Sequence, residues 1–510
     1  MPVFNFVRRS YYQDSVTLMT LSSEMEAAPG VSRAAAMMGT PPNLALLRDA
    51  GLLAAEGEGA DAGDLVVAVL AATPEAAEAA RAAALRALAA RRAVPAGAAA
   101  RPRTLAAARR ALPDANLVLI SVPGLYAGAE AFRALRAGLH VMLFSDNVPV
   151  DTELALKRAA LERGLWLLGP DCGTALIHGV PLGFANAVPR GRVGLVGASG
   201  TGLQEVSCAI AALGEGVSHA VGVGGRDLSD AVGGLMTRRA LEALAADPAT
   251  EVLVVVGKRP SPAMAGRLAQ DARRLDKPCV LGFVGGTTGL DGGGRLHVAG
   301  TLEDAARAAV ALARGEVPAA VDFTRPLDEI ERLVAEATAG LGPSQRYVRG
   351  VFSGGTLAWE ARHLLAERLP GVTEGVTGGG AGHRVTDLGE DVFTVGRPHP
   401  MLDGTVRRQW IAREGDDPGT AVLLLDVVLG WGAHPDPVGE ILPAIEATRA
   451  RARDAGRGLA IVASVTGTDR DPQRRTAQAA ALAAHGVVVM DSNAQAARLA
   501  ARVAAGRCPA

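Results

Sequence analysis

The feature that most constrains this fold is a repeated alternation of short apolar runs with longer stretches rich in Ala and Leu. The runs are nearly continuous, which is typical of strands buried on both faces of a parallel sheet. Strands that alternate with helices predict an α/β fold with mostly parallel sheets. The expected strands are Leu65–Ala71, Asn116–Val122, His140–Phe144, Arg192–Val196, Glu251–Val256, Cys279–Val284, Thr420–Val427, Leu459–Val465 and Gly486–Met490.

The length of 510 residues suggests about three domains, at roughly 150 residues each. One boundary is expected near Val188–Gly191, where VPRG precedes a new strand. Another is expected in Gly315–Gly342, where a charged helix and Gly/Pro segments separate two αβ blocks. The Ala- and Arg-rich stretch Pro74–Leu112 indicates helices around a surface loop. A basic arm for nucleic acid is the weaker interpretation, because acidic residues lie among the arginines.

Composition argues against several partners. The formal net charge is −1 and aromatic residues make up 3%, so neither nucleic acid nor a membrane surface is favoured. The N-terminus has no apolar core of a signal peptide, and no run is long enough to span a membrane, so a cytoplasmic location is expected. Cys172, Cys208, Cys279 and Cys508 form no CxxC pair. We therefore expect buried apolar thiols, no metal site and a reducing compartment.

The clearest functional signal is the turn Gly194–Gly202, which follows a strand and precedes the helical stretch LQEVSCAIAAL. Backbone N–H groups at such a helix start, together with the helix dipole, favour an anion. The spacing does not fit GxGxxG, and no lysine stands where a Walker A loop needs one. A tight turn that needs glycine only for packing is the alternative.

Similar turns recur along the chain. They contain Gly224 and Gly225, Ser353–Thr356, Gly430 and Gly432, and Val465–Asp469. Any one of them is a weak signal. Two successive αβ blocks with Ser/Gly-Thr turns at helix starts indicate an internal duplication, with two helix N-termini directed at one anion.

Longer segments resemble a known family. GRVGLVGASGTGLQEV, HAVGVGGRD and LEALAADPATEVLVVVGK follow the order seen in the ligase domain of succinyl-CoA synthetase α subunits. The stretch from LISVPGLYAG to LLGPDCG resembles the second half of that subunit's CoA-binding domain, and the last ~165 residues resemble the C-terminal ligase domain of the β subunit. The resemblance implies three doubly wound Rossmann or flavodoxin-like domains. They are a CoA-binding-like domain over 1–188, an α-type ligase domain over 189–320 and a β-type ligase domain over 343–510.

The chain resembles the FdrA family more closely. The segments that carry this resemblance are YYQDSVTLM, MMGTPPN, LFSDNV, GPDCGT, GASGTGLQE, GGRDLS, GGTLAWEA, TVGRPHPM and VTGTDRDPQ. It implies the large subunit of oxamate carbamoyltransferase, which moves a carbamoyl group between oxalurate and phosphate in allantoin degradation, giving oxamate and carbamoyl phosphate. It also implies additional protein subunits.

Three departures from the synthetases favour a transferase over a ligase. The segment Arg8–Ser15 stands where the synthetases have a glycine-rich loop near CoA, and it contains no glycine. Close backbone approach to a pyrophosphate needs a missing side chain, so CoA is not expected as a cofactor. His297 lies where the synthetases carry a phosphorylated histidine, but in the context GRLHVAG; a surface or buried, hydrogen-bonded histidine is the preferred interpretation. No ATP-grasp segment fits between the blocks.

The expected phosphate-binding residues are Ser199, Gly200 and Thr201 from one helix start, Gly224 and Gly225 from the next turn, and Ser353, Gly354, Gly355, Thr356, Gly430 and Gly432 from the other half. Arg397 is the candidate for a substrate carboxylate, and His399 for the carbamoyl oxygen or a proton. A proline-stiffened loop with solvated charges is the alternative for these two. The alternatives for the whole chain are an acyl-CoA ligase subunit, which would bind CoA, and a non-catalytic scaffold subunit.

Overall fold

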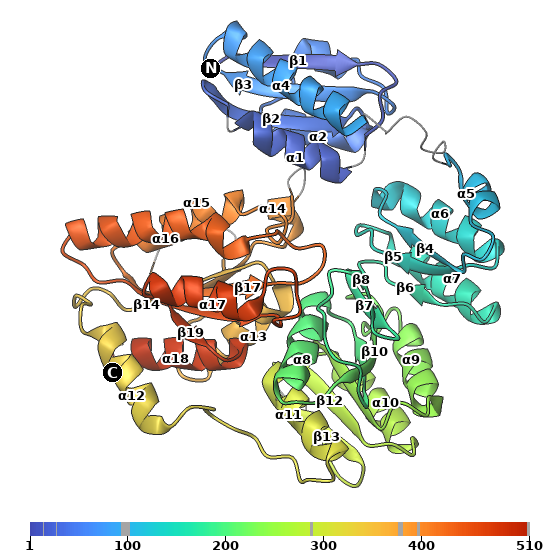
Figure 1. Ribbon diagram of the computed structural model, residues 1–510, viewed down its shortest axis with the longest axis vertical. Coiled ribbons are helices and arrows are strands. Elements are labelled where there is room, and N and C mark those ends of the chain that lie inside the picture. The colour runs from blue at the N-terminus through green and yellow to red at the C-terminus, as the bar shows by residue number, and fades with distance from the viewer. Residues whose placement is uncertain are drawn as a thin grey trace. The chain divides into compact units, whose positions relative to one another are not determined.

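The computed structural model describes residues 1–13, 15–26, 28–92, 102–285, 289–375, 381–394 and 398–506. Within these residues the chain forms two compact units. The smaller unit holds Met1–Asp114 and Glu390–His399, and the larger holds Ala115–Gly389 and Pro400–Ala510. Helices cover the sheets of both units (Figure 1).

The smaller unit is built on a three-stranded antiparallel sheet. Its strands, in spatial order, are β1 (Val3–Arg8), β3 (Leu65–Ala71) and β2 (Val31–Met38). The helices are α1 (Ser15–Glu26), α2 (Pro41–Asp49), α3 (Ala55–Glu58), α4 (Pro74–Arg92), α5 (Leu105–Ala111) and α14 (Asp391–Thr394). The prediction of a parallel Rossmann domain over 1–188 is therefore wrong for residues 1–114.

Both faces of the central strand β3 are covered in this antiparallel sheet. Val67 and Val69 belong to one apolar cluster, whereas Val66 and Ala68 belong to another. A strand buried on both faces has an unbroken apolar sequence whatever the direction of its neighbours. This burial explains why the sequence of β3 suggested a parallel sheet.

The larger unit begins with a small parallel sheet. Its strands are β4 (Leu117–Ile120), β5 (His140–Leu143) and β6 (Leu167–Leu168), with helices α6 (Gly124–Arg136) and α7 (Val150–Glu162). The expected boundary near Val188–Gly191 does not follow the sheets, because β7 (Thr174–Ile177) already pairs with β10 of the next sheet.

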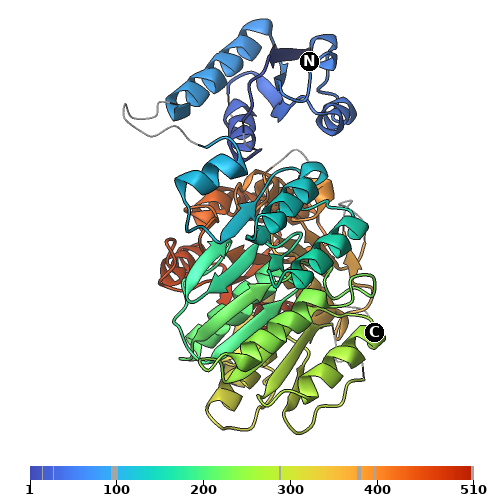
Figure 2. The ribbon, with the colours of Figure 1, turned by 90° about the vertical axis from the view of Figure 1, so that its right-hand side faces the viewer.

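The second sheet of this unit has seven strands. Their order is β13 (Leu296–Ala299), β12 (Cys279–Val284), β11 (Val252–Lys258), β9 (Val193–Gly197), β10 (Val217–Gly222), β7 and β8 (Val180–Gly183). The five strands from β9 to β13 are parallel. The helices are α8 (Gly200–Ala212), α9 (Leu235–Ala246), α10 (Pro262–Arg273) and α11 (Leu302–Ala313). Figure 2 shows α9 and α10 on the outer face of this sheet.

The third sheet has six parallel strands. Their order is β15 (Thr373–Glu374), β16 (Arg384–Asp387), β14 (Tyr347–Phe352), β17 (Thr420–Val428), β18 (Ala460–Thr466) and β19 (Val488–Met490). The helices are α12 (Leu327–Thr338), α13 (Gly355–Ala366), α15 (Thr405–Asp416), α16 (Pro437–Asp454), α17 (Arg475–Ala484) and α18 (Asn493–Ala505).

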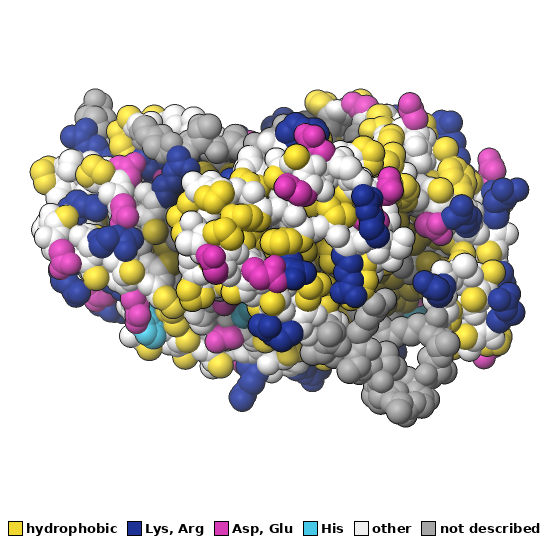
Figure 3. Space-filling model, turned by 90° about the horizontal axis from the view of Figure 1, so that it is seen from above, with side chains coloured by type: hydrophobic (Ala, Val, Ile, Leu, Met, Phe, Trp, Pro, Cys, Tyr) yellow, Lys and Arg dark blue, Asp and Glu magenta, His cyan; other side chains and the backbone are white. Residues whose placement is uncertain are grey.

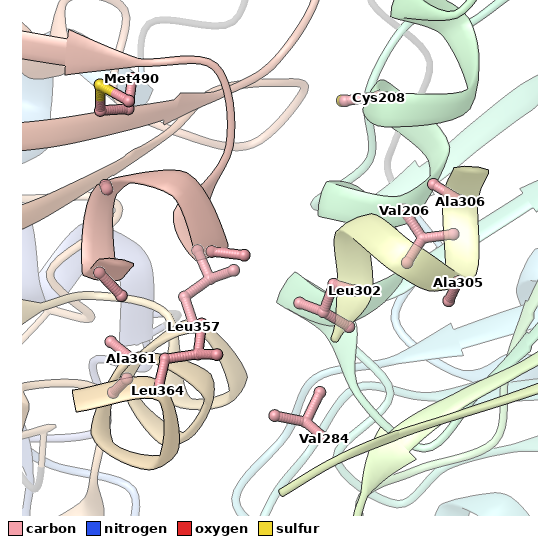
Figure 4. Close-up of a cluster of buried hydrophobic side chains, with 14 of the residues drawn as sticks. Val206, Cys208, Val284, Leu302, Ala305, Ala306, Leu357, Ala361, Leu364 and Met490 are labelled. Carbon is pink, nitrogen blue, oxygen red and sulfur yellow. The ribbon is translucent and has the colours of Figure 1, made fainter. Parts of the chain in front are cut away.

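The second and third sheets repeat one topology. In the second sheet, β9 lies between β10 and β11, and β12 and β13 follow on the β11 side. In the third sheet, β14 lies between β16 and β17, and β18 and β19 follow on the β17 side. One apolar core joins the two halves. Figure 4 shows Val206 of α8 and Leu302 of α11 on one side of it, and Leu357 and Leu364 of α13 on the other. We call the junction of α8 and α11 with α13 and α18 the seam.

The predicted fold class, α/β with mostly parallel sheets, is confirmed. Every predicted strand coincides with an observed one, from β3 to β19. The helices predicted within Pro74–Leu112 are confirmed by α4 and α5, whereas the predicted loop falls largely on residues 93–101, which lie outside the described ranges. Basic and acidic side chains are interspersed on the face in Figure 3.

Candidate functional site

The start of α8 lies at the carboxyl end of β9. Ser199 is its N-cap, and the Ser199 Oγ accepts a hydrogen bond from the Gly202 N–H at 2.9 Å. Glycine is required just before it, because a Cβ on Gly197 would lie 2.3 Å from the Leu203 side chain. Ser199, Gly200 and Thr201 are half-buried, so this helix start is partly exposed to solvent.

The start of α13 meets the start of α8 across the seam. The Ser199 and Thr356 hydroxyl oxygens lie 2.6 Å apart, and a Cβ on Gly354 would lie 3.1 Å from the Thr201 methyl. Each helix N-terminus carries about half a positive charge. The positive ends of two helix dipoles and two hydroxyl groups therefore lie at one place.

The two starts are not equivalent, because a buried carboxylate already occupies part of the second one. Asp426, at the end of β17, accepts hydrogen bonds from the Ser353 N–H at 2.8 Å and the Gly354 N–H at 2.7 Å. Arg407 pairs with this carboxylate at 3.1 Å. The amides of Ser353 and Gly354 are thus satisfied within the protein, whereas Gly355 and Thr356 follow as the first helical residues.

Gly430 and Gly432 lie in a tightly packed loop. The Gly430 N–H donates to the Gln473 side chain at 3.1 Å, and the neighbouring Trp431 N–H donates to the Ala185 carbonyl at 2.8 Å. Gly430 has φ +119°, and a Cβ there would lie 2.6 Å from that carbonyl. The requirement for glycine therefore comes from the approach of the loop before β9.

Gly224 and Gly225 also belong to a packed turn. A Cβ on the buried Gly224 would lie 2.2 Å from the Pro170 carbonyl oxygen, and the Gly224 carbonyl accepts the Asp227 N–H at 3.2 Å. This turn follows β10 and contacts the loop after β6. The role of Gly224 and Gly225 in phosphate binding stays a prediction.

The two candidates for the organic substrate are Arg397 and His399. Arg397 lies outside the described residues. His399 belongs to the smaller unit, and burial lowers the pKa of its imidazole to about 4. A histidine with so low a pKa stays neutral at physiological pH. The roles of both residues remain predictions.

His297 lies away from the edge at which parallel sheets bind ligands. It is the second residue of β13 and pairs with Val280 near the amino end of β12. Ligands bind at the carboxyl ends of such strands. This position agrees with the preferred interpretation that His297 is not a phosphorylated residue.

The cysteines are buried as expected. Cys172, Cys208 and Cys279 are free thiols in the core, and burial raises the thiol pKa of Cys172 and of Cys279 to about 12. Cys508 lies outside the described residues. Thiols with such pKa values are not nucleophiles at neutral pH.

Two buried glutamates, one in each half, each accept a hydrogen bond from a helix start of the other half. The Glu205 carboxylate of α8 accepts the Asn493 N–H at the start of α18, at 3.0 Å. The Glu360 carboxylate of α13 accepts the Leu302 N–H at the start of α11, at 2.7 Å. Each half thus caps a helix of the other. Burial, with help from nearby acidic groups, raises the pKa of the Glu360 carboxyl to about 8.

This pKa predicts a pH dependence of stability. A folded pKa of about 8, above the ordinary glutamate value of 4.5, contributes stability that is full at low pH and is lost as the pH rises through 8. We therefore expect the free energy of unfolding, measured with urea, to fall between about pH 5 and about pH 8. Glu360→Gln should flatten this slope, and Glu331→Gln on the exposed face of α12 should not. Equal slopes in all three proteins would contradict the assignment.

Comparison with known proteins agrees with this architecture. The CoA-ligase family matches residues 351–503, the CoA-binding domain family matches 189–272, and the family described as "AllF, heavy metal-associated domain" matches 1–103. The uncharacterized protein YahF of Escherichia coli is 40% identical over 509 residues, which cover 97% of both chains. This chain belongs to the YahF family.

More distant relatives are ligase subunits. The α 2 subunit of the ADP-forming succinate–CoA ligase of Archaeoglobus fulgidus is 29% identical over 231 residues, covering 44% of this chain and 77% of that subunit. Among solved structures, a dinucleotide-forming acetyl-coenzyme A synthetase of Ca. Korarchaeum cryptofilum is 16% identical, with a TM-score of 0.30, covering 78% of this chain and 84% of that one. This YahF-family chain is acyl-CoA ligase-like and resembles succinyl-CoA synthetase.

The CoA-binding family falls elsewhere than expected. It matches 189–272, which includes β9 and the start of α8, rather than 1–188. The matched region therefore contains the Ser199 turn itself.

The N-terminal residues do not fit the metal that their family description suggests. Residues 1–103 contain neither cysteine nor histidine, so methionine thioethers are their only soft ligands for a heavy metal. In the turn after β1, Arg9 pairs with Asp64 at 2.6 Å. Among the described residues, no group of acidic, cysteine or histidine side chains could hold a metal ion. None of the helices in the described ranges has the length and hydropathy needed to cross a membrane.

Proposed function

We propose that this chain is a subunit of an acyl-transferring enzyme of the CoA-ligase type, in which the start of α8 holds the phosphoryl group of an acyl phosphate. The observation that carries the proposal is the 2.6 Å contact between the Ser199 and Thr356 hydroxyls, which brings two helix N-termini together at the seam. The start of α8 is preferred over the start of α13, because the Asp426 carboxylate already accepts hydrogen bonds from the Ser353 and Gly354 amides just before α13.

The donors at this position suit phosphoryl oxygens. The Gly200 and Thr201 amides lie in the first turn of α8, where N–H groups have no partner within the helix. The hydroxyls of Ser199 and Thr356 can rotate to donate to an anion. Such fixed dipoles stabilise charge that develops on a transferring group without reorganising, so positioning and electrostatics would supply most of the catalysis.

Carbamoyl transfer is the second candidate, and the smaller unit favours it. The described residues up to 114 form a unit with an antiparallel sheet, and the segment Arg8–Ser15 has no glycine. Carbamoyl phosphate is also a mixed anhydride with phosphate, so the same site would serve it. In this case the partners would be oxalurate or oxamate, phosphate and further protein subunits.

Two assays distinguish the candidates. The purified chain, alone and with its partner subunits, is supplied either with oxalurate and phosphate or with CoA, ATP and short carboxylic acids. Acyl-CoA formation and CoA binding support the ligase, whereas carbamoyl phosphate formation without CoA binding supports the transferase. If the double variant Ser199→Ala/Thr356→Val keeps the full activity of the wild-type protein in both assays, the proposed site is wrong.

Phosphate binding tests the site without knowledge of the substrate. We expect Ser199→Ala and Thr356→Val each to weaken binding of inorganic phosphate about tenfold, because each removes a hydrogen bond to a charged group. Isothermal titration calorimetry measures this. Ser261→Ala is the matched control, since Ser261 caps α10 in the same manner, accepting the Met264 N–H at 3.2 Å. It should leave phosphate affinity unchanged.

A further inference from the structure

The lysines of this chain are few, and two of them have structural partners. Of the 52 basic residues only Lys157, Lys258 and Lys277 are lysines. Lys157 is fully buried among acidic groups, with its Nζ 2.7 Å from both Glu153 and Asp227. Lys277 donates to the carbonyls at the end of α9, including that of Leu244 at 3.1 Å.

Lys258 is the exception, and it lies at the ligand edge of its sheet. It is the last residue of β11, which pairs in parallel with β9, the strand that leads to Ser199. The Ala198 N–H still donates to the Val256 carbonyl at 2.9 Å, and a Cβ on Gly257 would lie 3.6 Å from the Ala198 Cβ. Val256 and Gly257 therefore contact Ala198, the residue before Ser199, and Lys258 is the next residue of β11.

An aromatic ring of the other half holds the Lys258 head group. Its Nζ lies 5.3 Å from the centroid of the Trp359 ring, and the Trp359 Nε1–H donates to the Val284 carbonyl at 3.2 Å. Trp359 lies about one helical turn after Thr356. The Lys258 side chain therefore reaches from the end of β11 to α13, about one helical turn after Thr356.

Trp359 is an uncharged partner for the Lys258 ammonium group. Cation–π contact orients an ammonium group and leaves its charge intact. Arg362, on the same ring at 4.4 Å, has a carboxylate partner in Glu374 at 3.6 Å. Lys258 is exposed and pairs with no acidic side chain in the part of the chain that the structure describes.

We infer that Lys258 binds a carboxylate of the substrate whose phosphoryl group occupies the start of α8, an inference that rests on the proposed function. The substrate class is a small acyl or carbamoyl phosphate with a second, anionic carboxylate end. Trp359 positions the ammonium, and the helix starts bind the phosphoryl end.

Two small phosphonates test this division. Phosphonoacetate carries both a phosphonate and a carboxylate, whereas methylphosphonate carries the phosphonate alone. Calorimetry with the full chain should show that phosphonoacetate binds about fivefold more tightly, as expected for one exposed ion pair. Lys258→Met should remove this preference and leave methylphosphonate binding unchanged, and Lys258→Arg should retain part of it.

The control is Arg259→Met, which removes one positive charge from the neighbouring exposed residue and should change neither affinity. If Lys258→Met keeps the preference, or weakens both ligands equally, the carboxylate role is wrong. If the wild-type chain binds both phosphonates equally, the role of Lys258 is wrong while the proposed phosphoryl site still holds. If it binds neither, the proposed phosphoryl site fails and the inference with it. Thermal unfolding confirms that each variant is folded.

Discussion

Replacing Lys157 by methionine is expected to lower the free energy of unfolding by about 3–5 kcal/mol, the cost of breaking a buried ion pair. The Lys157 Nζ lies 2.7 Å from both Glu153 and Asp227 and also donates to the Val223 carbonyl at 3.1 Å. All three charged side chains are completely buried. Without the ammonium group, two carboxylates would stay buried without their shared cation.

The loss would be specific to this position in the fold. Lys157 connects α7 to the turn after β10, so it joins the small parallel sheet to the seven-stranded one. Urea unfolding measures the effect, and Lys258→Met is the matched control, because it removes an exposed lysine and should change stability by less than about 0.5 kcal/mol. Adding Glu153→Gln to Lys157→Met should recover part of the loss. A Lys157→Met protein as stable as the control would contradict the buried network.

Thr201→Asp is expected to abolish phosphate binding without unfolding the protein. A carboxylate in the first turn of α8 would stand where the anion is proposed to bind, and two like charges about 4 Å apart repel by roughly 4 kcal/mol near a protein surface. Phosphate affinity should therefore fall by more than about a hundredfold. The same carboxylate interacts favourably with the helix dipole, so thermal stability should be equal or higher.

The neutral variant Thr201→Asn separates charge from shape. Asparagine has nearly the same shape as aspartate, so it should retain most of the phosphate affinity. Calorimetry and thermal unfolding of both variants provide the comparison. Equal loss of binding in the two variants would mean that shape, not charge, governs this position. Normal binding by Thr201→Asp would remove the start of α8 from the site.

The sequence predicts the strands well, because apolar β-branched runs mark buried strands wherever they occur. It does not reveal strand direction. Leu65–Ala71 has helices on both faces of an antiparallel sheet, so its unbroken apolar run looks like that of a parallel strand. The boundary near residue 188 fails for a similar reason. The short strands β7 and β8 join a sheet whose other strands come later in the chain.

The candidate site is predictable in part. Ser199 and Thr356 are recognisable as helix-start residues, but spacing cannot show that their hydroxyls meet across 157 residues of sequence. Glycines do not distinguish a ligand cradle from close packing, and at Gly430 the approaching group is the Ala185 carbonyl. Asp426 gave no signal beyond its place at a strand end, although it satisfies the amides of Ser353 and Gly354. Lys258 could have been noticed from the rarity of lysine.

A crystal structure of the chain with bound inorganic phosphate tests the central claim most directly. We predict a tetrahedral anion within hydrogen-bonding distance of the Gly200 and Thr201 amides, with the Thr356 hydroxyl turned toward it from the opposite helix. Phosphate bound elsewhere in a well-occupied site, with the Ser199 and Thr356 hydroxyls still bonded only to each other, would contradict the account.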